Sequence, residues 1–335
     1  MKNKRTKKRT RKKSNKTYTF KCNRSDILNE LLIGFGFKEE KEAKIVDFSL
    51  WDTYEQSAIE SRIKCIDRDY VNPIDNKRNF YDIMKKYNLE HHTPKTHPFV
   101  TKVTSDMLDG KKLHFLKHIH GSGGKDVYPV KTKIDINKIV KDDPDNYLLQ
   151  EEVNNMYLHD GKYKTTMRNY AMICDEGIYF YKEGYVYIYR EKYDRNCLDC
   201  KIHNAIFTAC DYEKLSKQPY YKRILPQLCK ICSQLLHQYF KNFNLKNRYI
   251  ILGIDFIIDK NYKPYIIEIN GFPNLNKSCG ESEVKQDMLN DFVKLYVLTT
   301  TKKKKPIRPG ALVAPPGFRP FPDLSKVILM SYRCV

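Results

Sequence analysis

One segment, Tyr249 to Leu275 (YIILGIDFIIDKNYKPYIIEINGFPNL), constrains the fold and the chemistry of this chain more than any other. Two apolar runs flank the polar sequence DKNYKP, a pattern that predicts an antiparallel hairpin. With a symmetric turn, Ile258 pairs with Tyr265, and Asp255 lies opposite Glu268. Side chains alternate between the two faces of a strand, so one face should be core and the other polar. The expected core face holds Leu252, Ile254, Phe256, Ile258, Tyr265, Ile267 and Ile269, and the polar face holds Asp255, Glu268 and Asn270.

The two opposed carboxylates are the chemically informative feature of this hairpin. Directly opposed residues of an antiparallel pair have Cβ atoms about 5 Å apart, and carboxylates that close repel unless a proton or a cation lies between them. Mg²⁺ is normally held by one or two carboxylates together with substrate phosphates, and an amide carbonyl such as that of Asn270 can complete the set. We therefore favour a Mg²⁺ and nucleotide-phosphate site formed by Asp255, Glu268 and Asn270. The alternative is a sheet with one wet face, on which these side chains are solvated.

A glycine-rich segment upstream supports the phosphate interpretation. In LHFLKHIHGSGGKDVYPV, an apolar strand that carries Lys117 leads into a loop that contains Gly121, Gly123 and Gly124. Glycines let successive backbone N–H groups turn toward one anion, and a nearby lysine adds a positive charge. The segment lacks the GxxxxGK[ST] pattern of a P-loop, and loops often use glycine for conformational reasons alone. The glycine-rich segment therefore indicates a phosphate site only together with the carboxylate hairpin that follows it.

The charge distribution divides the 335-residue chain, which is long enough for two or three packed lobes. Lysine and arginine outnumber aspartate and glutamate by 61 to 40, and residues 2–16 are strongly basic without a single acid. We expect residues 1–25 to form a disordered basic arm. Such an arm is typical of a nuclear signal, a nucleic-acid-binding segment, a dock for an acidic protein or a solvated tail. An N-terminal α/β lobe is expected over residues 26–100, a sheet-rich part over 101–298 and a Lys/Pro-rich tail over 299–335.

No segment predicts a membrane span or a secretory signal. The longest apolar runs, such as the one around Ile250 to Ile258, are interrupted by Asp255 and fall short of the roughly 20 residues that cross a bilayer. The charged N-terminus is not followed by an apolar stretch. We therefore expect an intracellular, cytoplasmic protein without membrane contact, and the nucleus or a virion are alternatives.

The order of several motifs along the chain resembles the tubulin-tyrosine-ligase family of ATP-grasp enzymes. The succession is a strand lysine, the glycine-rich loop, LLQEEV, KTTMR, YKEG, GIDF and IIEINGFP, and it covers about residues 75–295. Its most specific part is similar to the family patterns G-x-D-x-x-[LI]-D and [LI]-E-[VI]-N-x-x-P. The resemblance implies an α+β ATP-grasp fold over residues 101–298, in which two α+β lobes with antiparallel sheets grip ATP. A smaller N-terminal α/β lobe would precede them.

The resemblance also implies the cofactors ATP and Mg²⁺ and a role for each matching residue. Asp255, Glu268 and Asn270 would hold the metal, and Glu268 would act in catalysis together with Arg168, which faces the reacting groups. Asn204 would contact the substrate. The implied ATP-binding residues are Lys77, Lys117, Gly123, Gly124, Gln150, Val153 and Lys164.

Some positions depart from the family pattern on the substrate side. Thr166 stands where the family usually has Asp within K-F-D-[LI]-R, and Tyr187 stands where an Arg follows the family's Y-R-E-G hairpin. The family's L-T-N becomes Ile202, His203 and Asn204. These positions shape the acceptor and amino-acid site, so the resemblance does not extend to tubulin tyrosination in particular.

The function that the resemblance implies is an ATP-dependent carboxylate-amine ligase. ATP would phosphorylate an acceptor carboxylate, and an amine would displace phosphate from the acylphosphate. The expected partners are an acidic protein or peptide, which could be a tubulin tail, and a free amino acid; the basic chain suits such an acceptor. In one alternative, the same fold acts on a small molecule or a non-tubulin peptide. In another, the chain is an inactive nucleotide-binding protein whose basic tails bind nucleic acid or an acidic partner.

Overall fold

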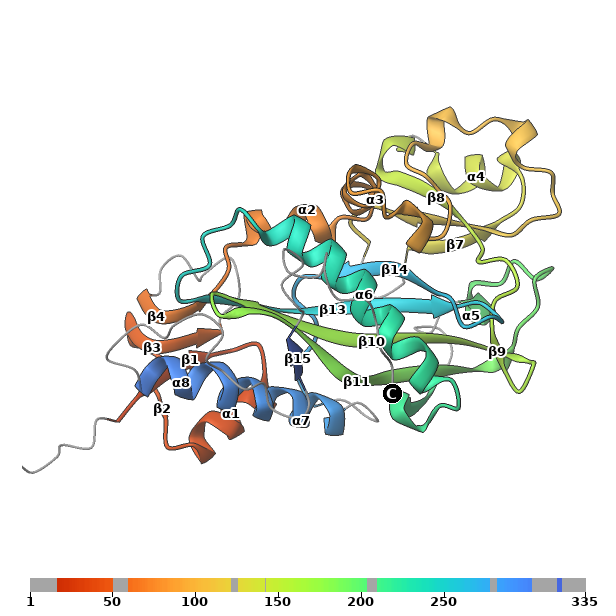
Figure 1. Cartoon of the computed structure of the whole chain (residues 1–335). Coiled ribbons are helices and arrows are strands. Elements are labelled where there is room, and N and C mark those ends of the chain that lie inside the picture. The colour runs from red at the N-terminus through yellow and green to blue at the C-terminus, as the bar shows by residue number, and fades with distance from the viewer. Residues whose placement is uncertain are drawn as a thin grey trace, which may run out of the picture.

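The protein has the mixed α+β architecture that the sequence predicts (Figure 1). The computed structural model describes residues 17–50, 60–121, 126–141, 143–203, 210–277, 282–302 and 318–320. Within these residues the strands form two sheets, one of eleven strands and one of four. Three expected site residues, Gly123, Gly124 and Asn204, lie outside the described part, as do residues 1–16 of the basic arm and most of the C-terminal tail. No helix in the described part combines the length and the apolar character that a membrane span requires.

The N-terminal segment contributes parallel strands to the larger sheet. Its elements are β1 (Thr19–Cys22), α1 (Asp26–Gly34), β2 (Lys38–Glu39), β3 (Ile45–Leu50) and β4 (Glu60–Cys65). β4 pairs in parallel with β13 (Arg248–Ile258), so strands that are far apart in the sequence share one sheet. Tyr249 is fully buried at this junction, where its ring stacks on Phe48 and its hydroxyl donates to the Ser49 carbonyl oxygen at 2.9 Å. Aromatic packing with a satisfied hydroxyl fixes the N-terminal strands against β13.

The remainder of the larger sheet is antiparallel, and β10 lies between β11 and β13. Among the short strands, β9 pairs with β10, and β12 and β15 pair with β11. The helix α6 runs diagonally across the sheet in Figure 1. The apolar side of α6, which includes Ile224, Leu228 and Leu235, is fully buried against the main core. The elements are β9 (Leu158–His159), β10 (Tyr163–Cys174), β11 (Gly177–Lys192), α5 (Cys200–His203), β12 (Cys210–Lys214), α6 (Tyr221–Phe240), β14 (Pro264–Asn270), α7 (Ser282–Phe292), α8 (Leu298–Lys302) and β15 (Phe318–Pro320).

The four-stranded sheet forms a smaller body with a core of its own, at the upper right of Figure 1. Its strands follow the antiparallel order β5-β8-β6-β7, and α4 packs on it through Ile136 and Val140. β5 pairs with β8, so residues 96–97 join this sheet and not the N-terminal strands. Its elements are β5 (Thr96–His97), β6 (His114–His118), β7 (Val127–Val130), α4 (Lys133–Val140) and β8 (Tyr147–Glu151). The helices that precede it, α2 (Asn72–Asp75) and α3 (Lys77–Lys86), bury Ile74, Phe80 and Met84 in the main core.

The predicted hairpin is present as β13 and β14, and Asp255 lies opposite Glu268 as expected. The predicted pairing of Ile258 with Tyr265 is wrong by one residue, because Tyr265 pairs with Ile257. A bulge between Asp255 and Phe256 causes this shift, since an extra residue on one strand moves every later pair by one. Five residues of the expected core face are buried in the main core as predicted: Leu252, Ile254, Phe256, Ile258 and Ile269. The prediction is wrong for Tyr265 and Ile267, which are partly buried against a separate small cluster, and Ile266 is in the main core in their place. Ile267 also lines a pocket with Lys77 and Lys117.

Candidate functional site

Arg168, Asp255, Glu268 and Asn270 meet on the larger sheet. Arg168 on β10 lies directly opposite Asp255 on β13, and its Nε and Nη2 atoms donate to Oδ1 and Oδ2 at 2.7 and 2.6 Å. The side-chain amide of Asn270 donates to Asp255 Oδ2 at 3.2 Å and to Glu268 Oε1 at 3.4 Å. The sheet register thus brings two carboxylates and an amide together, with a guanidinium held against one of the carboxylates.

Burial and neighbouring cations act in opposite directions on these groups. Burial raises the pKa of Asp255, and the Arg168 guanidinium opposes that rise. Burial acts in the same way on Glu268, but Lys77, Lys117 and Arg168 outweigh it and lower the pKa of Glu268 to about 2. Glu268 is therefore ionised at neutral pH. The two charged hydrogen bonds from Arg168 favour the ionised form of Asp255 as well.

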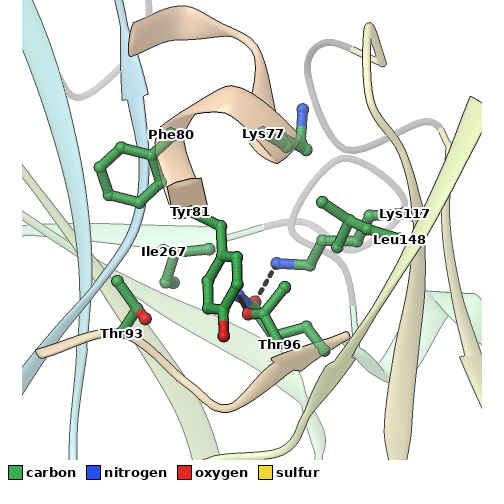
Figure 2. Close-up of a pocket in the computed structure, with 9 residues that line it drawn as sticks. Lys77, Phe80, Tyr81, Thr93, Thr96, Lys117, Leu148 and Ile267 are labelled. Carbon is green, nitrogen blue, oxygen red and sulfur yellow. Dashed lines mark hydrogen bonds between the residues drawn. The ribbon is translucent and has the colours of Figure 1, made fainter. Parts of the chain in front are cut away.

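A small pocket adjoins the carboxylates, between α3, the four-stranded sheet and β14 (Figure 2). Lys77 comes from the first turn of α3, and its Nζ lies 3.4 Å from Glu268 Oε2 and donates to the Gly121 carbonyl oxygen. Lys117 comes from β6, and its Nζ donates to Gln150 Oε1 at 2.6 Å, the contact drawn as a dashed line. Two expected phosphate-binding lysines thus lie beside one pocket, although they are distant in sequence. Phe80, Tyr81, Leu148 and Ile267 give the pocket its apolar lining.

Lys117 is buried and has no carboxylate in direct contact among the described residues. Burial lowers its pKa to about 7, although the charge of Glu268 raises it. Its partner Gln150 is held in turn, because Gln150 Nε2 donates to Thr96 Oγ1 at 3.1 Å and that hydroxyl donates to the Pro94 carbonyl oxygen at 2.8 Å. A buried ammonium without an anionic partner gains from a phosphate placed beside it, because desolvation strengthens their attraction.

Lys164 and Val153, which were also expected at the nucleotide, lie close by. Lys164 is buried, its Nζ donates to the His203 carbonyl oxygen at 2.7 Å, and the Phe115 ring lies 4.8 Å from it. Burial lowers the pKa of Lys164 to about 8. Val153 is buried in a small apolar cluster with Met156 and Ile257. Lys164 therefore faces an aromatic and carbonyl environment, whereas Lys77 faces Glu268.

The donor set fits Mg²⁺ bound together with phosphate. Asp255, Glu268 and Asn270 offer oxygen ligands, which hard cations prefer. No three His, Cys, Asp or Glu side chains in the described ranges group so as to hold a metal by themselves, so a cation here would need ligands from elsewhere. The Asn270 amide nitrogen donates to both carboxylates. A flip of the amide would exchange its nitrogen and oxygen, so that the oxygen would face the metal position.

Two of the departures from the expected family pattern, Thr166 and Tyr187, lie next to each other on the sheet. Thr166 on β10 is the direct cross-strand partner of Tyr187 on β11, two residues along from Arg168. The ring of Tyr212 on β12 meets that of Tyr187 edge-on, with centroids 5.3 Å apart. The sequence shows both substitutions, but only the β10–β11 register shows that together they form one neutral, aromatic surface beside Arg168.

Sequence reasoning missed two residues that support the site. Thr96 orients Gln150 from the two-residue strand β5, which has no recognisable strand pattern. Asp75 accepts a hydrogen bond at 3.1 Å from the backbone N–H of Gly271, the residue after Asn270. Asp75 ends α2 and Lys77 begins α3. Its position two residues before an expected site lysine was a signal in the sequence that Asp75 lies near the site.

Comparisons with known proteins point to one family. A model of the Tubulin-tyrosine ligase family matches residues 223–305, which include β13, β14 and the carboxylate pair. A probable tubulin polyglutamylase TTLL2 of Mus musculus is 27% identical over 197 residues, which cover 48% of this chain and 35% of that protein. Tubulin glycylase 3B of Tetrahymena thermophila is 26% identical, over 47% of this chain and 16% of its own length. A probable beta-tubulin polyglutamylase of the same organism is 24% identical, over 58% and 20%. The chain thus spans about a third or less of the length of each relative.

Proposed function

Because the chain is tubulin-tyrosine ligase-like, we propose that it is an ATP- and Mg²⁺-dependent ligase that joins an amino acid to a carboxylate of a protein or peptide. The observation that carries the proposal is the pairing of Asp255 with Glu268 across the hairpin, beside a pocket with Lys77 and Lys117. Opposed carboxylates next to two lysines, one of them buried, suit a metal-bound polyphosphate.

Each side chain then has a task that follows from its contacts. Asp255, Glu268 and Asn270 would hold Mg²⁺, which when bound neutralises charge on the phosphates of ATP. Lys117 would bind a phosphate oxygen from its buried position, and Lys77 would do so from the start of α3. The positive charge of these lysines would stabilise the charge that develops as an acceptor carboxylate takes up the phosphoryl group and as an amine replaces it.

Arg168 has a double task in this proposal. It fixes Asp255 through two hydrogen bonds, and the guanidinium lies on the side where Thr166, Tyr187 and Tyr212 form the neutral surface. We assign this surface to the second substrate, beyond the γ-phosphate. Because Thr166, Tyr187 and Tyr212 are neutral, this surface offers no fixed charge to the carboxylate or the ammonium of a free amino acid.

A basic surface on α6 suits an acidic protein as the acceptor. The stretch from Lys214 to Ile254 contains no Asp or Glu, although 40 of the 335 residues are acidic. The exposed cations on and just after α6 have no ion pair with any described residue, whereas Lys38, Arg190 and Lys277 elsewhere on the surface do. We define this basic face by Lys222, Arg223, Lys230 and Lys241.

The test is a reaction with mixed components. The full chain is incubated with Mg²⁺, ATP, all twenty amino acids and an acidic peptide with several glutamates, and ADP release and the peptide mass are followed. The proposal expects ADP release that depends on both peptide and amino acids, and a mass increase equal to one or more residues. Binding of ATP without ADP release under any of these conditions would instead support the inactive nucleotide-binding alternative.

A further inference from the structure

The corner between α2 and α3, which consists of residues 75–77, connects the carboxylate hairpin to the chain before the glycine-rich loop. On the hairpin side, Asp75 Oδ1 accepts a hydrogen bond from Gly271 N at 3.1 Å, directly after Asn270. On the loop side, Lys77 N donates to the Ile119 carbonyl oxygen at 3.4 Å, and Lys77 Nζ donates to that of Gly121. One short corner thus touches both segments that are expected to hold phosphate.

Gly271 lies so close to α2 that it has no room for a side chain. A Cβ atom on Gly271 would lie 2.2 Å from Val71 Cγ1 and 3.7 Å from Asp75 Cβ. Real contacts of this kind are never as short as 2.2 Å, so the Val71 side chain, α2 or the end of β14 would have to move. The close contact with the Val71 side chain and the hydrogen bond to the Asp75 side chain therefore fix the same point, the backbone at Gly271.

The corner also sets the position of Lys77. Asn76 caps α3, because its Oδ1 accepts hydrogen bonds from Arg78 N and Asn79 N. The cap fixes the direction of the first turn of α3, and thereby the backbone position of Lys77. Since Asp75 and Lys77 are two residues apart, the hydrogen bond to Gly271 N also sets the spacing between the Lys77 ammonium and Glu268, now 3.4 Å.

We propose that Asp75 is a positioning residue for the carboxylate hairpin. It holds the end of β14 through Gly271, and thereby holds Asn270 and Glu268 at the correct distance from Lys77. It acts as a hydrogen-bond acceptor and not as a charge, and it is not itself a metal ligand. The proposal rests on the proposed function for the meaning of this geometry, but the hydrogen bond and its effect on the hairpin are measurable without any ligand.

The test compares Asp75→Ala with Asp75→Asn. Asparagine keeps an acceptor oxygen at Oδ1 and loses only the charge, whereas alanine loses the acceptor. The probe is a fluorescent ATP analogue, whose binding to the full chain is titrated with Mg²⁺. Loss of one backbone hydrogen bond should raise the half-saturating Mg²⁺ concentration about three- to tenfold in Asp75→Ala. Asp75→Asn should stay within about twofold of the wild type, as should Asp82→Ala, a matched control on the exposed side of α3.

Hydrogen exchange provides a readout that needs no nucleotide. In the free protein, the peptide that spans residues 264–277 should exchange faster in Asp75→Ala and at the wild-type rate in Asp75→Asn. Gly271→Ala keeps Asp75 but displaces the same contact, and it should also speed exchange and raise the Mg²⁺ requirement. If Asp75→Asn behaves like Asp75→Ala, the role is electrostatic and the proposal is wrong.

The outcomes separate this proposal from the proposed function. Absence of nucleotide binding by the wild type, combined with the expected exchange pattern, would contradict the ligase and leave the positioning role of Asp75 standing. Normal nucleotide binding with unchanged exchange and an unchanged Mg²⁺ requirement in Asp75→Ala would contradict the positioning role alone. Thermal unfolding of each variant shows whether it is folded, and Gly271→Ala carries the test if Asp75→Ala is not folded.

Discussion

Arg168 and Asp255 are direct cross-strand neighbours, and the guanidinium of one holds both carboxylate oxygens of the other at 2.7 and 2.6 Å. The contact is planar and two-pronged, which an arginine can make and a lysine cannot. It fixes the orientation of Asp255 toward Glu268 and Asn270. The proposed metal site therefore depends on a residue from β10 as well as on the hairpin itself.

We expect Arg168→Lys to lower the rate of ADP release at least tenfold, because a single ammonium leaves one oxygen of Asp255 without its partner. Arg168→Met should also destabilise the fold by about 2 kcal/mol, since it leaves a mostly buried carboxylate uncompensated. Steady-state kinetics and urea unfolding measure the two effects. Arg190→Lys is the matched control, because Arg190 also pairs with an aspartate, Asp211, but on the exposed surface. Equal effects at both positions would contradict the special role of the Arg168 contact.

Glu268→Gln should abolish the Mg²⁺ dependence of nucleotide binding, because the amide keeps the shape of the side chain but loses the charge that attracts the cation. Binding of the fluorescent ATP analogue, with and without Mg²⁺, measures this. Glu283→Gln removes an exposed glutamate that pairs with Lys214, and it should leave the Mg²⁺ dependence unchanged. A wild-type Mg²⁺ response in Glu268→Gln would rule Glu268 out as a metal ligand.

Lys117 should make stability depend on pH in a defined window. Burial lowers its pKa to about 7 from the ordinary value of 10.5. Between these two values the unfolded chain binds a proton that the folded protein does not, so this residue's contribution to the free energy of unfolding rises with pH. Lys117→Met removes that contribution. The stability gained on Lys117→Met should therefore be largest below pH 7 and shrink as the pH rises toward 9.

Urea unfolding of the wild type and Lys117→Met at several pH values checks this expectation. Lys138→Met, on the exposed face of α4, is the control, and its effect on stability should not change over the same range. Nucleotide binding offers a second measurement. Because a phosphate favours the protonated lysine, binding at pH 8 should take up a proton, which calorimetry in buffers of different ionisation enthalpy detects. A pH-independent difference between wild type and Lys117→Met would contradict the lowered pKa.

The basic face of α6 should bind acidic polypeptides. The triple variant Lys222→Glu, Lys230→Glu and Lys241→Glu should weaken binding of poly-L-glutamate at least tenfold at low salt, and the difference should shrink at high salt. A control triple with the same change in net charge is Lys111→Glu, Lys138→Glu and Lys141→Glu, on exposed positions of the other body. Carbodiimide cross-linking followed by mass spectrometry identifies which lysines contact the glutamates. Equal losses in the two triples would mean that total charge, and not this face, governs binding.

The sequence by itself determined the hairpin and its chemistry. Alternation of apolar and polar residues in Tyr249 to Leu275 predicted two strands with opposed carboxylates, and the structure confirms the pairing of Asp255 with Glu268. This works because strand periodicity is local, and because two carboxylates at that spacing need a counter-charge wherever the hairpin packs. The mixed α+β class and the resemblance to the tubulin-tyrosine ligase family also followed from the sequence, because the order of motifs can be read without knowledge of packing.

Only the tertiary structure decided how distant segments meet. Because of the bulge, Tyr265 pairs with Ile257 and not with Ile258. The bulge depends on hydrogen bonds between the strands, so alternation alone could not assign every residue of the hairpin to its face. The contact between Arg168 and Asp255 depends on the register of β10 against β13, and the meeting of Lys77 with Glu268 depends on how α3 packs on β14. Such registers are set by side chains far apart along the chain. Local patterns therefore identify which residues carry the chemistry, and long-range packing decides which of them act together.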